Sequence, residues 1–246
     1  MNPPLSSPSI AIACGGTGGH LFPGLAVGRA LGRLGCRVSL FVSSKGIDQT
    51  AVANIADLAV VTLPAVAQQD RNYITFARSM ARAWSGSKAE FRRNRPDAVL
   101  AMGGFTSCPV VFAGASTGAL TFLHESNTIP GRANRLLAHW VDECFVGFPE
   151  AAGRLWNPRV TWTGTPSRDG FVVPTSAQVE ASRIRLGLDP QRPVLLVTGG
   201  SQGARGLNKL FLGALPQLVA TMPSLQYIHL TGEADLAMAE EAHAKL

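Results

Sequence analysis

Short apolar runs alternate along the chain with longer segments in which apolar residues recur every three or four positions. The short runs are typical of buried strands, and the periodic segments are typical of amphipathic helices. Predicted strands cover residues 10–14, 37–42, 58–63, 97–102, 119–123, 143–146 and 160–163, and predicted helices cover 23–34, 73–93, 109–115 and 130–139. Pro23 lies near the first turn of the first predicted helix. This alternation predicts an α/β fold, a parallel sheet with helices on both faces.

A segment rich in proline, serine and threonine follows, at residues 164–176, and is typical of a linker. The pattern then restarts with predicted strands at 193–198 and 225–230 and predicted helices at 207–219 and from 234. We therefore expect two domains, residues 1–165 and 166–246. Two strands and their helices are too few for a free-standing parallel domain, so we expect the second domain to be incomplete.

Three glycine-rich segments each follow a predicted strand and precede a predicted helix. They are GGTGGH at 15–20, MGGFTSCP at 102–109 and GGSQGA at 199–204. Glycine enters left-handed backbone regions and lets a ligand approach the main chain, and a helix N-terminus attracts anions. In open α/β sheets, ligands bind at the carboxyl ends of the strands. The sequence therefore predicts phosphate-binding turns at one sheet edge.

The net charge of +6 is local rather than general. Between Arg71 and Arg95 there are seven basic residues and one acidic residue, whereas the rest of the chain has fifteen of each. This balance argues against a nucleic-acid-binding protein. The four cysteines are far apart, and neither they nor the histidines show metal-ligand spacing. No apolar run is long enough to span a membrane, and the first nine residues do not resemble a signal peptide.

The predicted helix at 73–93 carries an aromatic stripe beside the basic patch. At helical spacing, Tyr73, Phe76, Met80 and Trp84 fall on one face, and Arg78 and Arg82 fall opposite. One interpretation is that the aromatic face packs on the core and the basic face is exposed to solvent. The basic surroundings favour the other, a patch that binds an anionic membrane surface.

The glycine segments, together with His124-Glu125-Ser126-Asn127, Pro130-Gly131 and Asn134-Arg135, resemble the MurG family of peptidoglycan glycosyltransferases from residue 10 to about residue 235. The resemblance implies a GT-B fold with two Rossmann-like domains. It implies metal- and cofactor-independent transfer, with inversion, of N-acetylglucosamine from UDP-N-acetylglucosamine to lipid I, giving lipid II. It also implies a peripheral location on the cytoplasmic face of the inner membrane.

The resemblance also implies roles for particular residues. His20 and Glu125 are the candidate catalytic residues, although a helix-start role for His20 and a structural role for Glu125 stay open. The candidate contacts of the acceptor diphosphate are Gly16, Gly103, Gly104 and Ser107. The candidate contacts of the donor are Thr17, Gly18, Gly19, Asn127, Arg168, Ser201 and Gln202.

Some features depart from the family. Ser126, Thr165 and Phe105 stand where the family usually has glutamine, asparagine and tyrosine. The family also continues past the point where this sequence ends, so a non-catalytic or split-enzyme fragment completed by a partner chain is an alternative. A dinucleotide-dependent oxidoreductase is weaker, because a third glycine at the expected offset and an acidic residue after the second strand are missing.

Overall fold

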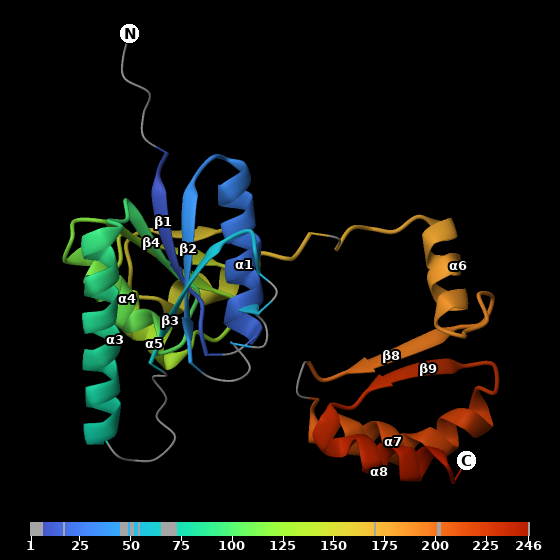
Figure 1. The fold of residues 1–246 in the computed structure, drawn as a ribbon. Coiled ribbons are helices and arrows are strands. Elements are labelled where there is room, and N and C mark those ends of the chain that lie inside the picture. Colours follow the sequence, from blue (N-terminus) through green and yellow to red (C-terminus); the bar gives the residue numbers. More distant parts are fainter. Residues whose placement is uncertain are drawn as a thin grey trace. The chain divides into compact units, whose positions relative to one another are not determined.

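The computed structural model describes residues 7–16, 18–44, 49, 52–53, 55–64, 73–169, 171–200 and 203–245. It divides into two compact units, Met1–Phe171 and Val172–Leu246 (Figure 1). The sequence placed this boundary at residue 165, within the linker. Both units are built from parallel strands and helices, which confirms the predicted α/β class.

Unit 1 contains a parallel sheet of seven strands in the order β3-β2-β1-β4-β5-β6-β7. The strands are β1 Ser9–Ala13, β2 Arg37–Ser43, β3 Ala59–Leu63, β4 Ala98–Ala101, β5 Leu120–Glu125, β6 Glu143–Val146 and β7 Val160–Trp162. The order reverses between β1 and β4, which pair in parallel. At such a switch point the following helices leave toward opposite faces, and ligands bind outside the strand ends.

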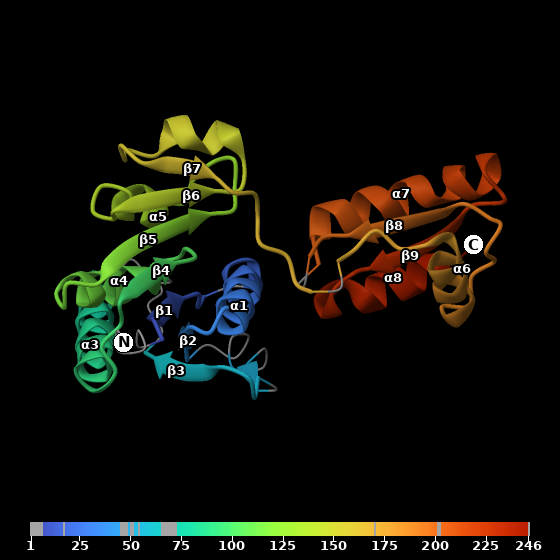
Figure 2. The same cartoon turned by 90° about the horizontal axis from the view of Figure 1, so that it is seen from above.

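Helices cover both faces of this sheet (Figure 2). They are α1 Gly18–Arg33, α3 Tyr73–Arg93, α4 Ser107–Ala115 and α5 Arg132–Leu137, with a short 3-10 helix at Pro149–Arg154. Side chains alternate along β1, so Ile12 packs with α1, while Ala11 and Ala13 pack with the helices of the other face. The two faces therefore have separate apolar cores. The loops after β1 and β4 lie next to each other at the carboxyl edge of the sheet.

The first helix starts earlier than the sequence predicted. It begins at Gly18, so Pro23 lies inside it rather than near its first turn. Proline has no N–H, so this position cannot donate to the carbonyl one turn back. The consequence for the site is that His20 belongs to the first turn of α1, at the positive end of the helix.

The helix predicted at 73–93 is α3, with the same bounds, but its aromatic stripe is divided. Phe76 and Met80 pack against the core, together with the buried Ala83 and Phe91. Tyr73 is 70% exposed and Trp84 is 41% exposed. Phe76 and Met80 therefore contribute to the core, as the core-facing interpretation expects, and the membrane patch stays a prediction.

Unit 2 has a two-stranded parallel sheet, β8 Val194–Thr198 and β9 Gln226–Leu230. Its helices are α6 Ser176–Arg185, α7 Arg205–Thr221 and α8 Leu236–His243, with a 3-10 turn at Glu233–Asp235. Its small core is formed by Val197, Phe211 and Leu215. The sequence analysis missed α6, although Thr175 and Gln178 form a capping box at its start.

Candidate functional site

Glycine turns bring main-chain groups to the switch point of unit 1. Gly16, Gly103 and Gly104 have φ angles of 113°, 119° and 77°, a region that side chains disfavour. Gly16 follows β1, and the other two follow β4, the paired strand. These turns and the start of α1 bring main-chain groups and a helix N-terminus to one place, which is suited to an anion.

The imidazole of His20 lies on the Gly103-Gly104 backbone. A Cβ atom built on Gly103 would lie 2.8 Å from Nε2 of His20, and one on Gly104 would lie 3.3 Å from Nδ1. A side chain at Gly103 would force the ring to move, and one at Gly104 would make a tight contact with it. The structure therefore brings together His20 and the two glycine turns, as the sequence predicted for the sheet edge, and places an ionisable ring among main-chain groups.

Ser107 lies below the turn that it was expected to complete. Its side chain is fully buried, and its hydroxyl is placed to donate to the carbonyl oxygens of Gly103 at 2.7 Å and Ala13 at 3.1 Å. These bonds tie the turn after β4 to the end of β1. The hydroxyl thus holds the two turns in register, and the burial of Ser107 separates it from a ligand on the surface.

Glu125, at the end of β5, is buried and has four hydrogen-bond donors around it. Oε1 accepts from the backbone N–H and the side-chain amide of Asn127, both at 2.8 Å. Oε2 accepts from the backbone N–H of Gly131 at 3.0 Å and from Nδ2 of Asn134 at 2.8 Å. A carboxylate with both oxygens occupied in this way anchors the loop 126–131, which favours the structural role that the sequence left open.

Asn134 is a site residue that the sequence analysis quoted but did not single out. Its Nδ2 donates to Glu125 and would lie 3.3 Å from a Cβ atom on Gly103. Its Oδ1 is buried and has no hydrogen-bond partner within the described residues. The two acceptors of Nδ2 fix the amide orientation, so Oδ1 is a spare acceptor near the turn after β4.

Arg168 is held against α1. Its guanidinium carbon lies 4.8 Å from the ring centre of Phe22 and 5.4 Å from that of Phe171. The next residue, Asp169, pairs with Arg33 at 2.8 Å. Stacking on Phe22 leaves the donor groups at the edge of the guanidinium plane available, and it places Arg168 beside the helix turn that carries His20.

Of the remaining predicted residues of unit 1 that the structure describes, Gly19 and Asn127 are at the surface. Gly18 and Gly19 are the first residues of α1, and Gly19 is exposed. Asn127 is exposed at the loop that Glu125 anchors. Thr17, Ser201 and Gln202 lie outside the described residues.

In unit 2 the glycine turn after β8 is packed against the loop after β9. A Cβ atom on Gly203, which has a φ of 73°, would collide with the carbonyl oxygen of Thr231. Asn208 is buried beneath this contact and donates to that same carbonyl at 2.8 Å and to Asp235 at 3.0 Å. Asp235 also accepts from Nε of Arg205 at 2.9 Å, and these two bonds lower the pKa of its carboxyl. The guanidinium of Arg205 is thus fixed at the first turn of α7.

The described residues contain no helix long and apolar enough to cross a membrane. They also contain no group of three or more His, Cys, Asp or Glu side chains able to hold a metal ion.

We expect unit 1 to lose stability as the pH falls below about 6.5, because His124 is buried at the end of β5. Burial lowers the pKa of His124, outweighing the hydrogen bond to the Gly164 carbonyl and the charge of Glu125, which raise it. A depressed histidine pKa means that the unfolded chain takes up the proton first, so stability is full above the unfolded pKa and declines as the pH falls through it toward the folded pKa. Thermal unfolding of wild type and His124→Gln between pH 5 and 7.5 measures this. The variant should show the smaller decline, and parallel curves would contradict the prediction.

Comparison with known proteins identifies the family. Residues 10–146 match the glycosyltransferase family 28 N-terminal domain, and residues 194–246 match the glycosyltransferase family 28 C-terminal domain. The chain is 37% identical, over 240 residues, to a protein of Synechococcus sp. (strain CC9902) named UDP-N-acetylglucosamine--N-acetylmuramyl-(pentapeptide) pyrophosphoryl-undecaprenol N-acetylglucosamine transferase. A protein of Halorhodospira halophila with the same name is 35% identical over 244 residues.

These alignments cover 96% and 98% of this chain but only 64% and 65% of the relatives, so the chain spans about two thirds of their length. The crystal structure of Acinetobacter baumannii MurG superposes with a TM-score of 0.66 at 21% identity, covering 96% of this chain and 63% of that one. That likeness supports the fold. The chain therefore belongs to glycosyltransferase family 28, and the relatives above place its similarity within that family among MurG-type transferases.

Proposed function

We propose that this protein transfers N-acetylglucosamine from UDP-N-acetylglucosamine to lipid I, forming lipid II. The observation that carries the proposal is the surface at the switch point, where His20 lies on Gly103 and Gly104 beside the start of α1. Such a surface offers main-chain N–H groups and a positive helix end to a diphosphate, and places a titratable ring next to it. The names of the relatives supply the substrates.

In this proposal His20, rather than Glu125, takes the proton of the acceptor hydroxyl. The acceptor's 4-hydroxyl oxygen attacks the anomeric carbon of the sugar, the bond from that carbon to the diphosphate oxygen breaks, and UDP leaves. The His20 side chain is half-buried at the turn, whereas the carboxylate of Glu125 is buried within the loop that it anchors. A base must be able to reach the proton that it removes, and this requirement favours His20.

The proposed acceptor diphosphate contacts are the main-chain groups of Gly16, Gly103 and Gly104. Ser107 acts below them by holding the turn. The proposed donor contacts are Thr17, Gly18, Gly19, Asn127, Arg168, Ser201 and Gln202, of which Arg168 is the cation suited to the leaving diphosphate.

Transfer of labelled N-acetylglucosamine from UDP-N-acetylglucosamine to a lipid I analogue tests the proposal. Because the relatives are longer, the assay uses both the 246-residue chain and a fusion to the remaining C-terminal segment of the Synechococcus relative. Product formation by either protein supports the proposal. If only the fusion is active, or if the 246-residue chain becomes active when that segment is added as a separate chain, the result supports the split-enzyme alternative. Absence of product from both proteins, with normal folding of both, contradicts it. The family assignment gives the oxidoreductase alternative no support.

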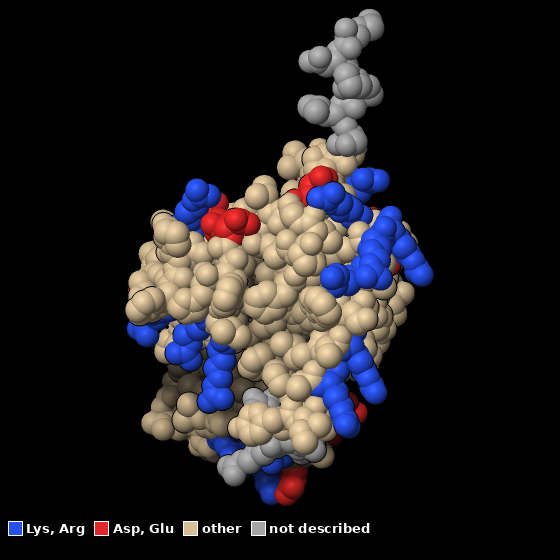
Figure 3. Space-filling view, turned by 90° about the vertical axis from the view of Figure 1, so that its left-hand side faces the viewer, with Lys and Arg blue, Asp and Glu red and all other residues tan. Residues whose placement is uncertain are grey.

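A peripheral membrane role follows from the same substrate, because lipid I is lipid-linked. The side of unit 1 that carries α3 has many more Lys and Arg than Asp and Glu side chains in view (Figure 3). The exposed apolar residues of α3 are Tyr73, Ile74 and Trp84, and Nζ of Lys88 lies 4.7 Å from the Trp84 ring centre. Exposed aromatic side chains beside cations are suited to the interface of an anionic bilayer, here proposed to be the cytoplasmic leaflet of the inner membrane.

We expect Arg78→Ala/Arg82→Ala to weaken binding to anionic vesicles by about thirtyfold at low salt, since each cation near such a surface contributes about 1 kcal/mol. Trp84→Ala should also weaken binding, and salt should reduce binding of the wild type. Vesicle co-sedimentation measures these effects. The matched control is Arg132→Ala/Arg135→Ala, which removes two exposed charges from α5. Equal binding by all variants would assign α3 a purely structural role.

A further inference from the structure

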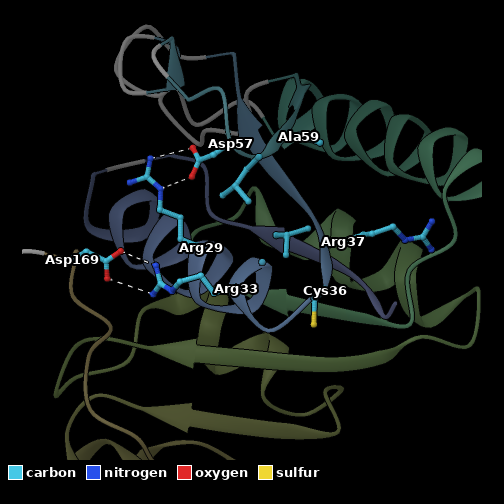
Figure 4. Close-up of a pocket in the computed structure, with 10 residues that line it drawn as sticks. Arg29, Arg33, Cys36, Arg37, Asp57, Ala59 and Asp169 are labelled. Carbon is cyan, nitrogen blue, oxygen red and sulfur yellow. Dashed lines mark hydrogen bonds and ion pairs between the residues drawn. The ribbon is translucent and has the colours of Figure 1, made fainter. Parts of the chain in front are cut away.

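Two adjoining cavities lie at the amino-terminal edge of the sheet of unit 1, the edge opposite to the glycine turns. The first has a volume of about 750 Å³, lies between the end of α1 and the start of β3, and is shown in Figure 4. The second has a volume of about 470 Å³ and lies between the starts of β1, β2 and β3 and the end of α3. Both are lined by Arg37, Val38 and Ala59, so they form one continuous surface.

Two of the three arginines that line the first cavity, Arg29 and Arg33, are already paired. Arg29 binds Asp57 through Nε at 2.7 Å and a second nitrogen at 3.2 Å. Arg33 binds Asp169 in the same two-pronged way, at 2.8 and 3.4 Å. Figure 4 shows both pairs, and it shows the Arg37 side chain turned away from them toward the segment that follows α3. The first cavity therefore has little unbalanced charge of its own.

The second cavity is different, because three arginines line it: Arg37, Arg93 and Arg95. Within the part of the chain that the structure describes, none of the three forms an ion pair. Arg95 uses one nitrogen to donate to the carbonyl oxygen of Thr117.

Two carboxylates accept hydrogen bonds from residues that line this cavity, and within the described residues neither forms an ion pair with its arginines. Asp97 accepts from the backbone N–H of Ser9 at 2.7 Å, and Glu90 accepts from the side-chain amide of Asn94 at 2.7 Å. The lining of the second cavity itself thus has three arginines and no acidic side chain, and the guanidinium groups of Arg37 and Arg93 make no hydrogen bond to another described residue.

We propose that this second cavity binds a soluble phosphate-bearing molecule through Arg37 and Arg93. Guanidinium groups match phosphate oxygens in pairs, and a cavity of this volume is large enough for a small phosphorylated ligand. A lipid headgroup is the other source of phosphate, and the geometry disfavours it. The cavity is at the last turn of the 21-residue helix α3, about 30 Å along the helix from Tyr73 and about 14 Å from Trp84, so it lies apart from both exposed aromatic residues. The site does not depend on the transferase activity.

The experiment is a titration of the ¹⁵N-labelled 246-residue chain with inorganic pyrophosphate, followed by NMR. The amides of Ser39 and Asn94 report this cavity, and those of Gly103 and Gly104 report the glycine turns, so the two sites are distinguished. We expect saturable shifts at Ser39 and Asn94. Arg37→Gln/Arg93→Gln should weaken the binding at this cavity about tenfold or more, the scale of one lost charged hydrogen bond, and leave the shifts at the turns unchanged. Arg95 is kept because it supports the loop at Thr117.

The matched control is Arg78→Gln/Arg82→Gln, which removes the same charge from earlier turns of α3 and should change the binding at Ser39 and Asn94 less than twofold. If the two double variants weakened pyrophosphate binding equally, the binding would depend only on the overall positive charge of this region. That result would overturn the proposal. Absence of shifts at Ser39 and Asn94 in the wild type would also overturn it. So would shifts with anionic vesicles but not with pyrophosphate, which would assign the cavity to a headgroup. If Arg93 only stabilised the end of α3, Arg37→Gln/Arg93→Gln would have a lower melting temperature but unchanged pyrophosphate binding. This result would also contradict the proposal.

Discussion

His20→Ala should lower turnover about a hundredfold or more in whichever protein, the chain or its fusion, is active in the transfer assay. This is the usual scale of the loss of a general base. The ring lies on the backbone of Gly103 and Gly104. Both φ angles are positive, a conformation that glycine adopts by itself, so the turns can keep their shape when the ring is removed. The expected loss is therefore in turnover rather than in folding, and steady-state kinetics with the lipid I analogue measure it.

His139→Ala is the matched control, because this exposed histidine contacts Trp156 and lies outside the predicted site. It should leave turnover within about twofold of wild type, since surface substitutions of this kind have small effects. Added imidazole should restore part of the activity of His20→Ala if the ring moves a proton. Near-normal turnover of His20→Ala would return His20 to the helix-start role.

Glu125→Ala should lower the free energy of unfolding of unit 1 by about 2–4 kcal/mol, because it leaves the buried amide of Asn134 with only the long hydrogen bond to the His124 carbonyl, at 3.4 Å, and opens a cavity. Glu125→Gln should cost about half as much, since one amide oxygen still accepts while its NH₂ faces donors. Urea denaturation, followed by the fluorescence of the tryptophans, which all belong to unit 1, measures both.

Glu143→Ala is the control for the loss of a carboxylate on the neighbouring strand. Glu143 accepts one exposed hydrogen bond, from the Thr161 hydroxyl, so we expect a change within about 0.5 kcal/mol. If Glu125→Gln kept full stability and yet abolished turnover, the carboxylate would be chemical rather than structural. The two outcomes separate the roles that the sequence alone left open.

The comparison of α3 with its prediction shows where sequence reasoning reached its limit. Hydrophobic periodicity located its ends at Tyr73 and Arg93. It could not divide the aromatic stripe, because the core begins only where the sheet and α4 contact the helix. Phe76 makes an edge contact with Phe105 at 5.4 Å, while Tyr73 on the same face lies at the exposed first turn.

The sequence by itself determined the strand and helix order, because side-chain periodicity and glycine placement are local properties of the chain. It also located the glycine turns and His20, since these follow strands whose ends must share one sheet edge. Only the tertiary structure decided which side chains are buried or hydrogen-bonded by neighbouring residues. The four donors around Glu125, the burial of Ser107 and the spare acceptor of Asn134 arise from loops that fold back on one another. The gathering of Arg37 and Arg93 at one cavity depends on the packing of α3 beside the sheet, which joins positions far apart in the chain and leaves no local pattern.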